Sequence, residues 1–229
     1  MTIEPPDAAA FRERLLSTPG ERRDIDYKSS LPFAGDDAFT LKLIRHIQGM
    51  ANAGGGWLVI GYSQDTGALI PDPSHSDATC STYEPTQISQ RVDSSVLRGQ
   101  RVTLEVHYEP HPETGIRHPL IRVYGFERLP YVCRSFKAAT DTGDQILRQG
   151  AVYLRRPGAE TSEISTASDW EDVIGRCVRL RRDEFLSEFT ELFERMTSPP
   201  ISQPSAWSRL EDVISGGRRH AFPQPDAPQ

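Results

Sequence analysis

The stretch Gly49-Met50-Ala51-Asn52-Ala53-Gly54-Gly55-Gly56-Trp57-Leu58-Val59-Ile60-Gly61-Tyr62 decides the fold. Apolar residues recur at steps of three and four over residues 40–51, which predicts an amphipathic helix there. The three glycines end that helix and let the chain turn tightly. Residues 57–62 are a continuous run of strand-forming side chains, which indicates a buried central strand. We therefore expect this helix to pack on a sheet that contains this strand.

Weaker patterns on both sides of this stretch predict the remaining elements. Residues 24–28 alternate charged and apolar side chains, as a half-buried strand does. Apolar residues at i, i+4 and i+8 predict a second long helix over 86–97, capped by Thr86. Further strands are expected at 101–108, 120–124 and 152–154. The predicted fold class is α/β (α+β), a mixed sheet of about five or six strands packed with helices.

Composition and capping signals divide the chain into four parts. A short helix is expected within residues 1–20, followed by a compact domain over 21–172. A capping pattern that begins at Ser168 opens a long helix, of which we assign 173–197 as the C-terminal helix. Residues 198–229 are rich in Pro, Ser and Gly and are predicted to form a tail.

The overall composition argues against several classes of protein. The 229 residues include 26 Lys and Arg against 32 Asp and Glu, a net charge of -6, which argues against a generic nucleic-acid-coating protein. No apolar run approaches the roughly 20 residues that span a bilayer, so we expect no membrane association. Residues 1–10 have neither the basic start nor the apolar run that a secretion signal would show, and the three cysteines lie far apart in the sequence. We therefore expect free thiols in a reducing cytoplasm.

Charged residues gather around the two predicted strands. Glu21, Asp26 and Lys28 belong to the first strand segment, and Asp65 follows the central strand. If the two strands are neighbours, three carboxylates and one ammonium group come close together. Such a set is suited to holding Mg²⁺ or Mn²⁺ against a phosphodiester. By spacing alone this indication of a metal site is weak, because acidic residues at strand ends are usually solvated.

These same residues carry a resemblance to a known family. The pattern Glu21-x4-Asp26-Tyr27-Lys28-Ser29, the helix that ends in the Gly54-Gly55-Gly56 block, and the strand over 57–62 together resemble the Schlafen-type AlbA-like domain. The later segment Tyr153-Leu154-Arg155-Arg156-Pro157-Gly158-Ala159 is similar to the closing strand and turn of that family. The resemblance covers about residues 21–172.

The resemblance implies binding and cleavage of RNA. Schlafen-core proteins bind and cleave structured RNA, notably tRNA, through three carboxylates. The first two positions fall on Glu21 and Asp26, and the third falls near Gln64, with Asp65 one position further on. The resemblance therefore implies Glu21, Asp26 and Asp65 as metal ligands, with Lys28 steadying the scissile phosphate. This chain departs from the family pattern at Asp26, which replaces the usual Glu, and at the amide Gln64.

Binding residues and cofactors also follow from the resemblance. Lys28, Arg155 and Arg156 are the preferred phosphate contacts. The zinc site of vertebrate members has no matching Cys/His cluster here, so we expect no zinc, and without a Walker lysine we do not expect ATP. The family core has two similar lobes, whereas this chain has room for one. A homodimer would recreate the second lobe.

Three functions remain open from the sequence. The favoured one is a nucleic-acid-binding module for tRNA-like RNA or single-stranded DNA. The first alternative is a metal-dependent endoribonuclease that cleaves tRNA. The second alternative is a non-catalytic regulatory or protein-interaction domain that uses the long C-terminal helix.

Overall fold

The computed structural model describes residues 8–65, 67–156 and 160–197, and within the last range it gives no side-chain detail for 192–197. The chain divides into two compact units, 1–181 and 182–229. The predicted tail over 198–229 and the turn at 157–159 lie outside the described residues. Among the helices that are described, none is long and apolar enough to cross a membrane.

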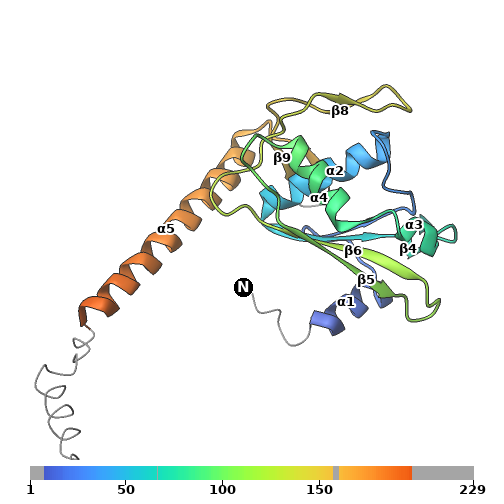
Figure 1. The fold of residues 1–229 in the computed structure, drawn as a ribbon, viewed down its shortest axis with the longest axis horizontal. Coiled ribbons are helices and arrows are strands. Elements are labelled where there is room, and N and C mark those ends of the chain that lie inside the picture. The colour runs from blue at the N-terminus through green and yellow to red at the C-terminus, as the bar shows by residue number, and fades with distance from the viewer. Residues whose placement is uncertain (1–7, 66, 157–159, 198–229) are drawn as a thin grey trace, which may run out of the picture. The chain divides into compact units, whose positions relative to one another are not determined.

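A four-stranded mixed sheet forms the centre of the first unit (Figure 1). Its order is β1 (Ile25–Lys28), β2 (Gly55–Ile60), β6 (Arg117–Tyr124) and β5 (Leu104–Pro110). β1 runs parallel to β2, and the other neighbours are antiparallel. The mixed sheet is confirmed, and the strands expected at 24–28 and 57–62 are direct neighbours in it.

The expected count of five or six strands in this sheet was wrong. The other described strands pair with each other in short ladders instead of extending the sheet. These ladders join β3 (Tyr62–Asp65) to β4 (Ala68–Pro71), β7 (Lys137–Ala138) to β8 (Gln145–Leu147), and β9 (Tyr153–Arg155) to β10 (Thr161–Glu163). The chain leaves the central strand at Gly61, whose φ of 96° favours glycine, and so β3 turns away from the sheet.

Capping side chains, a proline and a glycine set the ends of the two helices that pack on the sheet. α2 (Ala38–Ala53) is capped by Asp37 and ends at Gly54, which has a left-handed φ of 117°. α4 (Pro85–Ser95) is capped by Glu84, not by Thr86, because Pro85 starts the helix and the Glu84 carboxylate accepts from the amides of Thr86 and Gln87. The other helices are α1 (Ala8–Ser17), α3 (Asp77–Cys80) and α5 (Ala167–Thr197).

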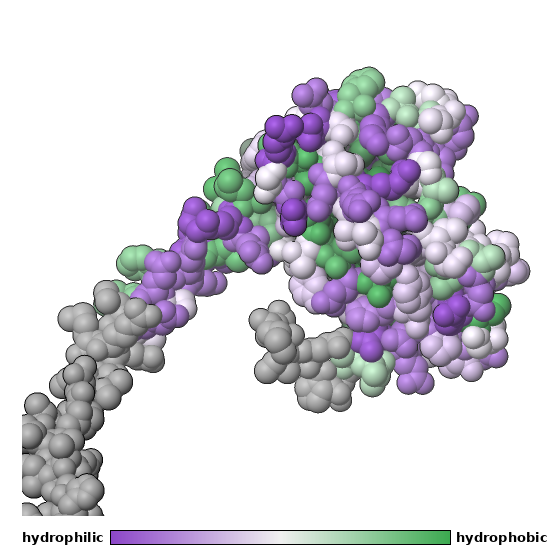
Figure 2. All heavy atoms as spheres, in the orientation of Figure 1, coloured by the Kyte–Doolittle hydropathy of each residue, from purple (hydrophilic) through white to green (hydrophobic). Residues whose placement is uncertain are grey.

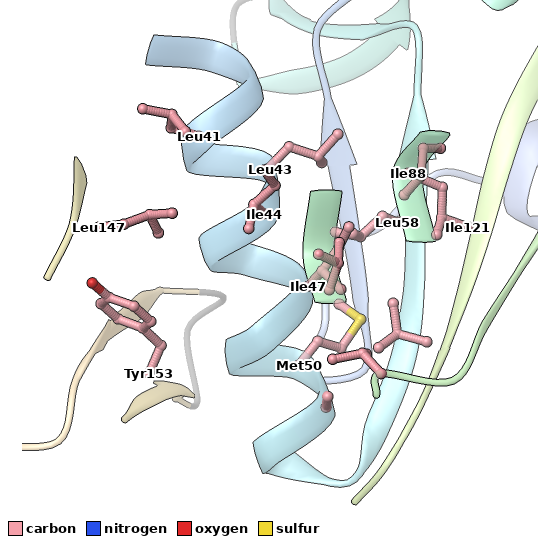
Figure 3. Packing of buried hydrophobic residues seen from close by; sticks show 14 of the residues in the cluster. Leu41, Leu43, Ile44, Ile47, Met50, Leu58, Ile88, Ile121, Leu147 and Tyr153 are labelled. Atoms are coloured by element: carbon pink, nitrogen blue, oxygen red, sulfur yellow. The ribbon is translucent and has the colours of Figure 1, made fainter. Parts of the chain in front are cut away.

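Two hydrophobic layers cover the two faces of the sheet. On one face, Leu58 and Ile60 of β2 pack against α2 and α4, and Figure 3 shows α2 with its buried side chains in this layer. On the other face, Val59 and Trp57 pack with Tyr27 of β1 and with Leu15 of α1. This alternation is the period of two that a strand covered on both faces requires.

One buried amide fixes β9 against α2. Asn52 donates from Nδ2 to the carbonyls of Tyr131 and Tyr153, at 3.0 and 2.8 Å, and accepts from the Tyr131 amide at 2.7 Å. Nearby, Gly49 leaves no room for a side chain, because an added Cβ would collide with Thr161 of β10. β9 therefore lies close to α2, and this placement matters for Arg155.

Three buried histidines, His75, His111 and His118, lie together near the end of β2 and the start of β6. His118 donates from Nδ1 to the Ile60 carbonyl at 2.8 Å and stacks on His75 with ring centroids 4.3 Å apart. His75 donates from Nε2 to the Arg117 carbonyl and accepts from the Ser30 hydroxyl. Burial and the neighbouring histidines lower the pKa of His118 to about 4.

This pKa predicts acid sensitivity of the fold. Between pH 6.5 and about 4 the unfolded chain protonates at His118 while the folded protein does not, so stability falls as the pH falls. The free energy of unfolding should drop by at most about 1.4 kcal/mol per pH unit from this histidine. His118→Asn keeps a donor near the Nδ1 position and removes the titration. Urea unfolding between pH 7 and 4 should show a shallower slope for this variant, and an equal slope would contradict the assignment.

Candidate functional site at the start of β1

Asp26 lies in the interior, not at a solvated strand end. Its side chain is 1% exposed, and its Oδ2 atom lies 2.7 Å from Lys28 Nζ and 3.2 Å from Arg155 Nη1. The ring of His46, on α2, is 3.7 Å away, but burial and the charge of Lys28 lower its pKa to about 3, which leaves it neutral. Two cations therefore neutralise the Asp26 carboxylate.

The alternation of β1 explains this burial. Tyr27 points to the layer with α1, so Asp26 and Lys28 point to the opposite face. As expected from the sequence, Asp26 and Lys28 lie together. That face is covered by α2 and β9, because β9 is held against α2 by Asn52.

Arg155 was expected to contact phosphate, and the structure corrects this. Its side chain is 0% exposed, and its guanidinium donates to the carbonyls of Arg22, Arg23 and Ile25 at 3.0–3.3 Å. The side chain thus ties the backbone that leads into β1 to β9 and supplies the counter-charge for Asp26. No phosphate reaches a guanidinium in this position.

Arg156 is partly exposed and already has an acidic partner. Its Nη2 atom donates to Asp169 at 2.7 Å, and the same carboxylate accepts from the amides of Ser165 and Thr166 at the start of α5. This arrangement fixes the N-terminus of α5 to the end of β9. The sequence led us to expect that Arg156 contacts phosphate. In the structure it instead holds α5 against the end of β9.

Glu21 lies at the surface, just before β1. Partial burial raises its pKa, and the nearby Asp26 carboxylate raises it further, while Lys28 opposes the shift. The structure therefore does bring Glu21, Asp26 and Lys28 together, as the sequence led us to expect. Of these three, Glu21 faces open space.

That space is a cleft of about 660 Å³ between the α1–β1 connection and the β3–β4 hairpin. Glu21, Tyr27 and Gln64 are among the residues that line it. Asp65 is exposed at the end of β3 and is not in this lining. The position that the family pattern assigns to a third carboxylate is thus occupied at the cleft by the amide of Gln64.

The residues do not fit the divalent metal site that the family resemblance implies. Within the described parts of the chain, no three His, Cys, Asp or Glu side chains lie close enough together to hold a metal ion. Asp26 is already paired with two cations, and Asp65 does not join Glu21 at the cleft. The expected ligand set of Glu21, Asp26 and Asp65 is therefore not assembled.

A second cleft, of about 480 Å³, lies on the other side of the α1–β1 connection. Phe11, Arg14 and Arg22 line it, and Glu21 and Tyr27 belong to both clefts. The Arg14 guanidinium lies over the Phe11 ring, 5.3 Å from its centroid. The sequence prediction missed Arg14 and Phe11, because it gave α1 no functional role.

Comparison with known proteins finds a distant likeness among solved structures. The DIP2311 protein from Corynebacterium diphtheriae matches with a TM-score of 0.41 and 17% identity, over 72% of this chain and 27% of that one. The N-terminal domain of a RecG-related helicase-like protein from Nitrosomonas europaea matches with a TM-score of 0.32 and 14% identity, over 69% of this chain and 94% of that domain. This chain thus spans about a quarter of the Corynebacterium protein. No family model and no curated protein matches the chain.

The groups around the α1–β1 connection can contact an anionic ligand. Exposed cations and an aromatic ring surround the α1–β1 connection, whereas the buried carboxylate of Asp26 is paired with two cations. Glu21 adds one acidic group with a raised pKa at the boundary of the two clefts.

Proposed function

We propose that this chain is a nucleic-acid-binding domain of the Schlafen AlbA-like type, which binds tRNA-like RNA or single-stranded DNA without cutting it. The α1–β1 connection and its two flanking clefts form the binding face. The observation that carries the proposal is the group of exposed arginines and an aromatic ring around these clefts, next to a carboxylate that is neutralised internally.

The cations on this face are accessible to a phosphate backbone. The side chains of Arg22 and Arg23 are 61% and 48% exposed, and Arg14 is also exposed. Arg22 and Arg23 contact Asp24 and Asp172 at 3.8 and 3.6 Å, also through exposed side chains. Such surface pairs contribute little, so phosphates compete for these arginines at small cost. Arginine suits this task because its planar fork contacts phosphate oxygens in pairs.

The aromatic ring gives this face a way to hold bases. Phe11 is partly buried, packs on Trp57 with centroids 5.8 Å apart, and lines the smaller cleft. Single-stranded nucleic acids stack unpaired bases on such rings while cations follow the backbone. Duplex DNA offers no unpaired base for stacking. Single-stranded RNA and DNA, and RNA loops, are therefore the expected ligands.

Salt dependence of binding tests this proposal. Replacing both Arg14 and Arg22 with Gln should weaken binding of a single-stranded RNA oligonucleotide, because two phosphate contacts and their released counterions are lost. The slope of log K against log salt should flatten by about 1.4, at roughly 0.7 per contact for single strands. Fluorescence anisotropy over a range of salt concentrations measures this slope.

The matched control replaces Arg98 and Arg101 with Gln. Both are exposed, and both lie between α4 and β5, outside the lining of either cleft. The control should keep the slope of the wild-type protein. If the control flattens the slope as much as the Arg14/Arg22 variant, or if that variant keeps the wild-type slope, the proposed face is wrong.

A further inference from the structure

The face of the central sheet that carries α1 is partly exposed where β6 ends. Ile121 and Val123 of β6 are buried in the layer with α2 and α4. Because side chains alternate along a strand, Arg122 and Tyr124 point to the opposite face, where Trp57 of β2 packs in the layer with α1. Trp57 is buried there, whereas Arg122 and Tyr124 are partly exposed. This face therefore opens to solvent at the end of β6.

Arg122 joins two aromatic rings on this face. Its guanidinium carbon lies 5.2 Å from the centroid of the Trp57 ring and 5.4 Å from the centroid of the Tyr124 ring. Trp57 in turn packs on Phe11, which lines the smaller cleft. Phe11, Trp57, Arg122 and Tyr124 thus form a continuous series of flat groups, which we call the aromatic row. The row begins at the smaller cleft and ends at the exposed part of the sheet.

The two positions that flank Tyr124 across the sheet carry little side chain. Opposite Tyr124 in the ladder between β2 and β6 is Gly55, which has no side chain at all. On the other side, the Tyr124 amide donates to the carbonyl of Thr103, a small residue that is exposed. These neighbours leave room beside the tyrosine ring for a flat ligand.

The polar groups around the aromatic row favour an unpaired base over a phosphate group as its occupant. Glu105 lies opposite Arg122 in the ladder between β5 and β6, and its side chain is 54% exposed. Charges on directly opposite residues interact, so Glu105 offsets the attraction of Arg122 for phosphate. A carboxylate also accepts hydrogen bonds from N–H groups on the edge of a base. A polar ligand suits the surface that Figure 2 shows for the first unit, where hydrophilic residues are interspersed with small hydrophobic areas.

We propose that the exposed end of the aromatic row is a second stacking site, which holds an unpaired base of a single strand bound at the α1–β1 connection. The base stacks on the ring of Tyr124 and on the guanidinium of Arg122, while the backbone of the strand follows the arginines at the clefts. Such stacking accepts every base, because each base has a flat π-face. The inference rests on the proposed function, since the strand must also bind at the clefts.

The test compares binding of a labelled oligothymidine with binding of an abasic strand of the same length, by fluorescence anisotropy. Tyr124→Leu removes the ring without changing the charge, so it should weaken binding of oligothymidine by about five- to a hundredfold at constant salt. The same variant should bind the abasic strand as the wild-type protein does, because that strand has phosphates but no bases. The slope of log K against log salt should stay unchanged, since no phosphate contact is lost.

Three further variants serve as controls. Tyr124→Phe keeps the ring and should bind oligothymidine like the wild-type protein. Tyr108 of β5 is exposed on the opposite face of the sheet, where its hydroxyl donates to the Tyr83 carbonyl, so Tyr108→Leu should also leave binding unchanged. Arg122→Lys keeps the charge but not the flat guanidinium. It should weaken binding of oligothymidine and not of the abasic strand, and it replaces Tyr124→Leu if that variant does not fold.

The outcomes separate this stacking site from the proposed function. A wild-type protein that binds neither strand would overturn nucleic-acid binding, and this inference with it. A wild-type protein that binds oligothymidine, together with a folded Tyr124→Leu variant that binds it equally well, would overturn the stacking site alone. The same holds if the variant loses affinity for the abasic strand to the same extent, because the ring would then act without a base.

Discussion

Replacing Arg155 with Ala is expected to lower the free energy of unfolding by about 3–5 kcal/mol, the usual cost of removing one partner from a buried ion pair. The change leaves Asp26 in the interior with Lys28 as its remaining cation and removes three hydrogen bonds to backbone carbonyls before β1. Urea unfolding monitored by circular dichroism measures the effect.

Arg156→Ala is the matched control for this prediction. Arg156 is the next residue along the chain, but its side chain is partly exposed, and its partner Asp169 keeps two backbone amide donors when the arginine is lost. Its loss should cost about 1 kcal/mol. If the two variants unfold at the same urea concentration, the Asp26–Arg155 pair stabilises the fold no more than the Arg156–Asp169 pair does.

A further variant tests whether Arg155 contacts RNA. Arg155→Lys keeps the positive charge, and we expect this variant to bind RNA with the wild-type salt slope.

Val59→Asp is expected to have an effect of similar or larger size. Val59 is fully buried in β2, between β1 and β6, and packs with Tyr27, Trp57 and Leu120. An aspartate there would place a charge without a partner in an apolar layer, which costs several kcal/mol. Thermal unfolding by circular dichroism should show a much lower midpoint, or no cooperative transition.

The control for Val59→Asp is Ala138→Asp. Ala138 also belongs to a strand, β7, but it is exposed. Its substitution should change the free energy of unfolding by no more than about 0.5 kcal/mol. A Val59→Asp variant that melts like this control would show that β2 is not the central strand.

The sequence predicted the elements with strong periodicity well. The helix expected over 40–51 and the strand expected over 57–62 correspond to α2 and β2. Both elements are largely buried, and buried elements carry long apolar patterns that can be recognised in the sequence. The position of the α4 cap was wrong by two residues, since a proline at the first helical position moved the start of the helix. The number of strands in the central sheet was also wrong, because periodicity does not show which strands pair.

The candidate site could be predicted only in part. The pattern around β1 correctly placed Asp26 and Lys28 on one face. It could not show that β9, more than 120 residues later, covers this face and supplies Arg155 as the counter-charge. Two consecutive arginines suggested a basic surface, whereas the structure buries Arg155 at the end of β9 and leaves Arg156, just after the strand, partly exposed. Contacts of such long range follow from packing, which local patterns do not encode.

The central claim is that this face binds nucleic acid and does not cleave it. The most direct measurement incubates the wild-type protein with labelled tRNA and single-stranded RNA in Mn²⁺ or in EDTA, and separates the products on native and denaturing gels. We predict a mobility shift of equal strength in both conditions, with the RNA intact. Cleavage that requires Mn²⁺ and disappears in a folded Glu21→Gln variant would contradict the claim, because it would show that the carboxylates do assemble a metal site.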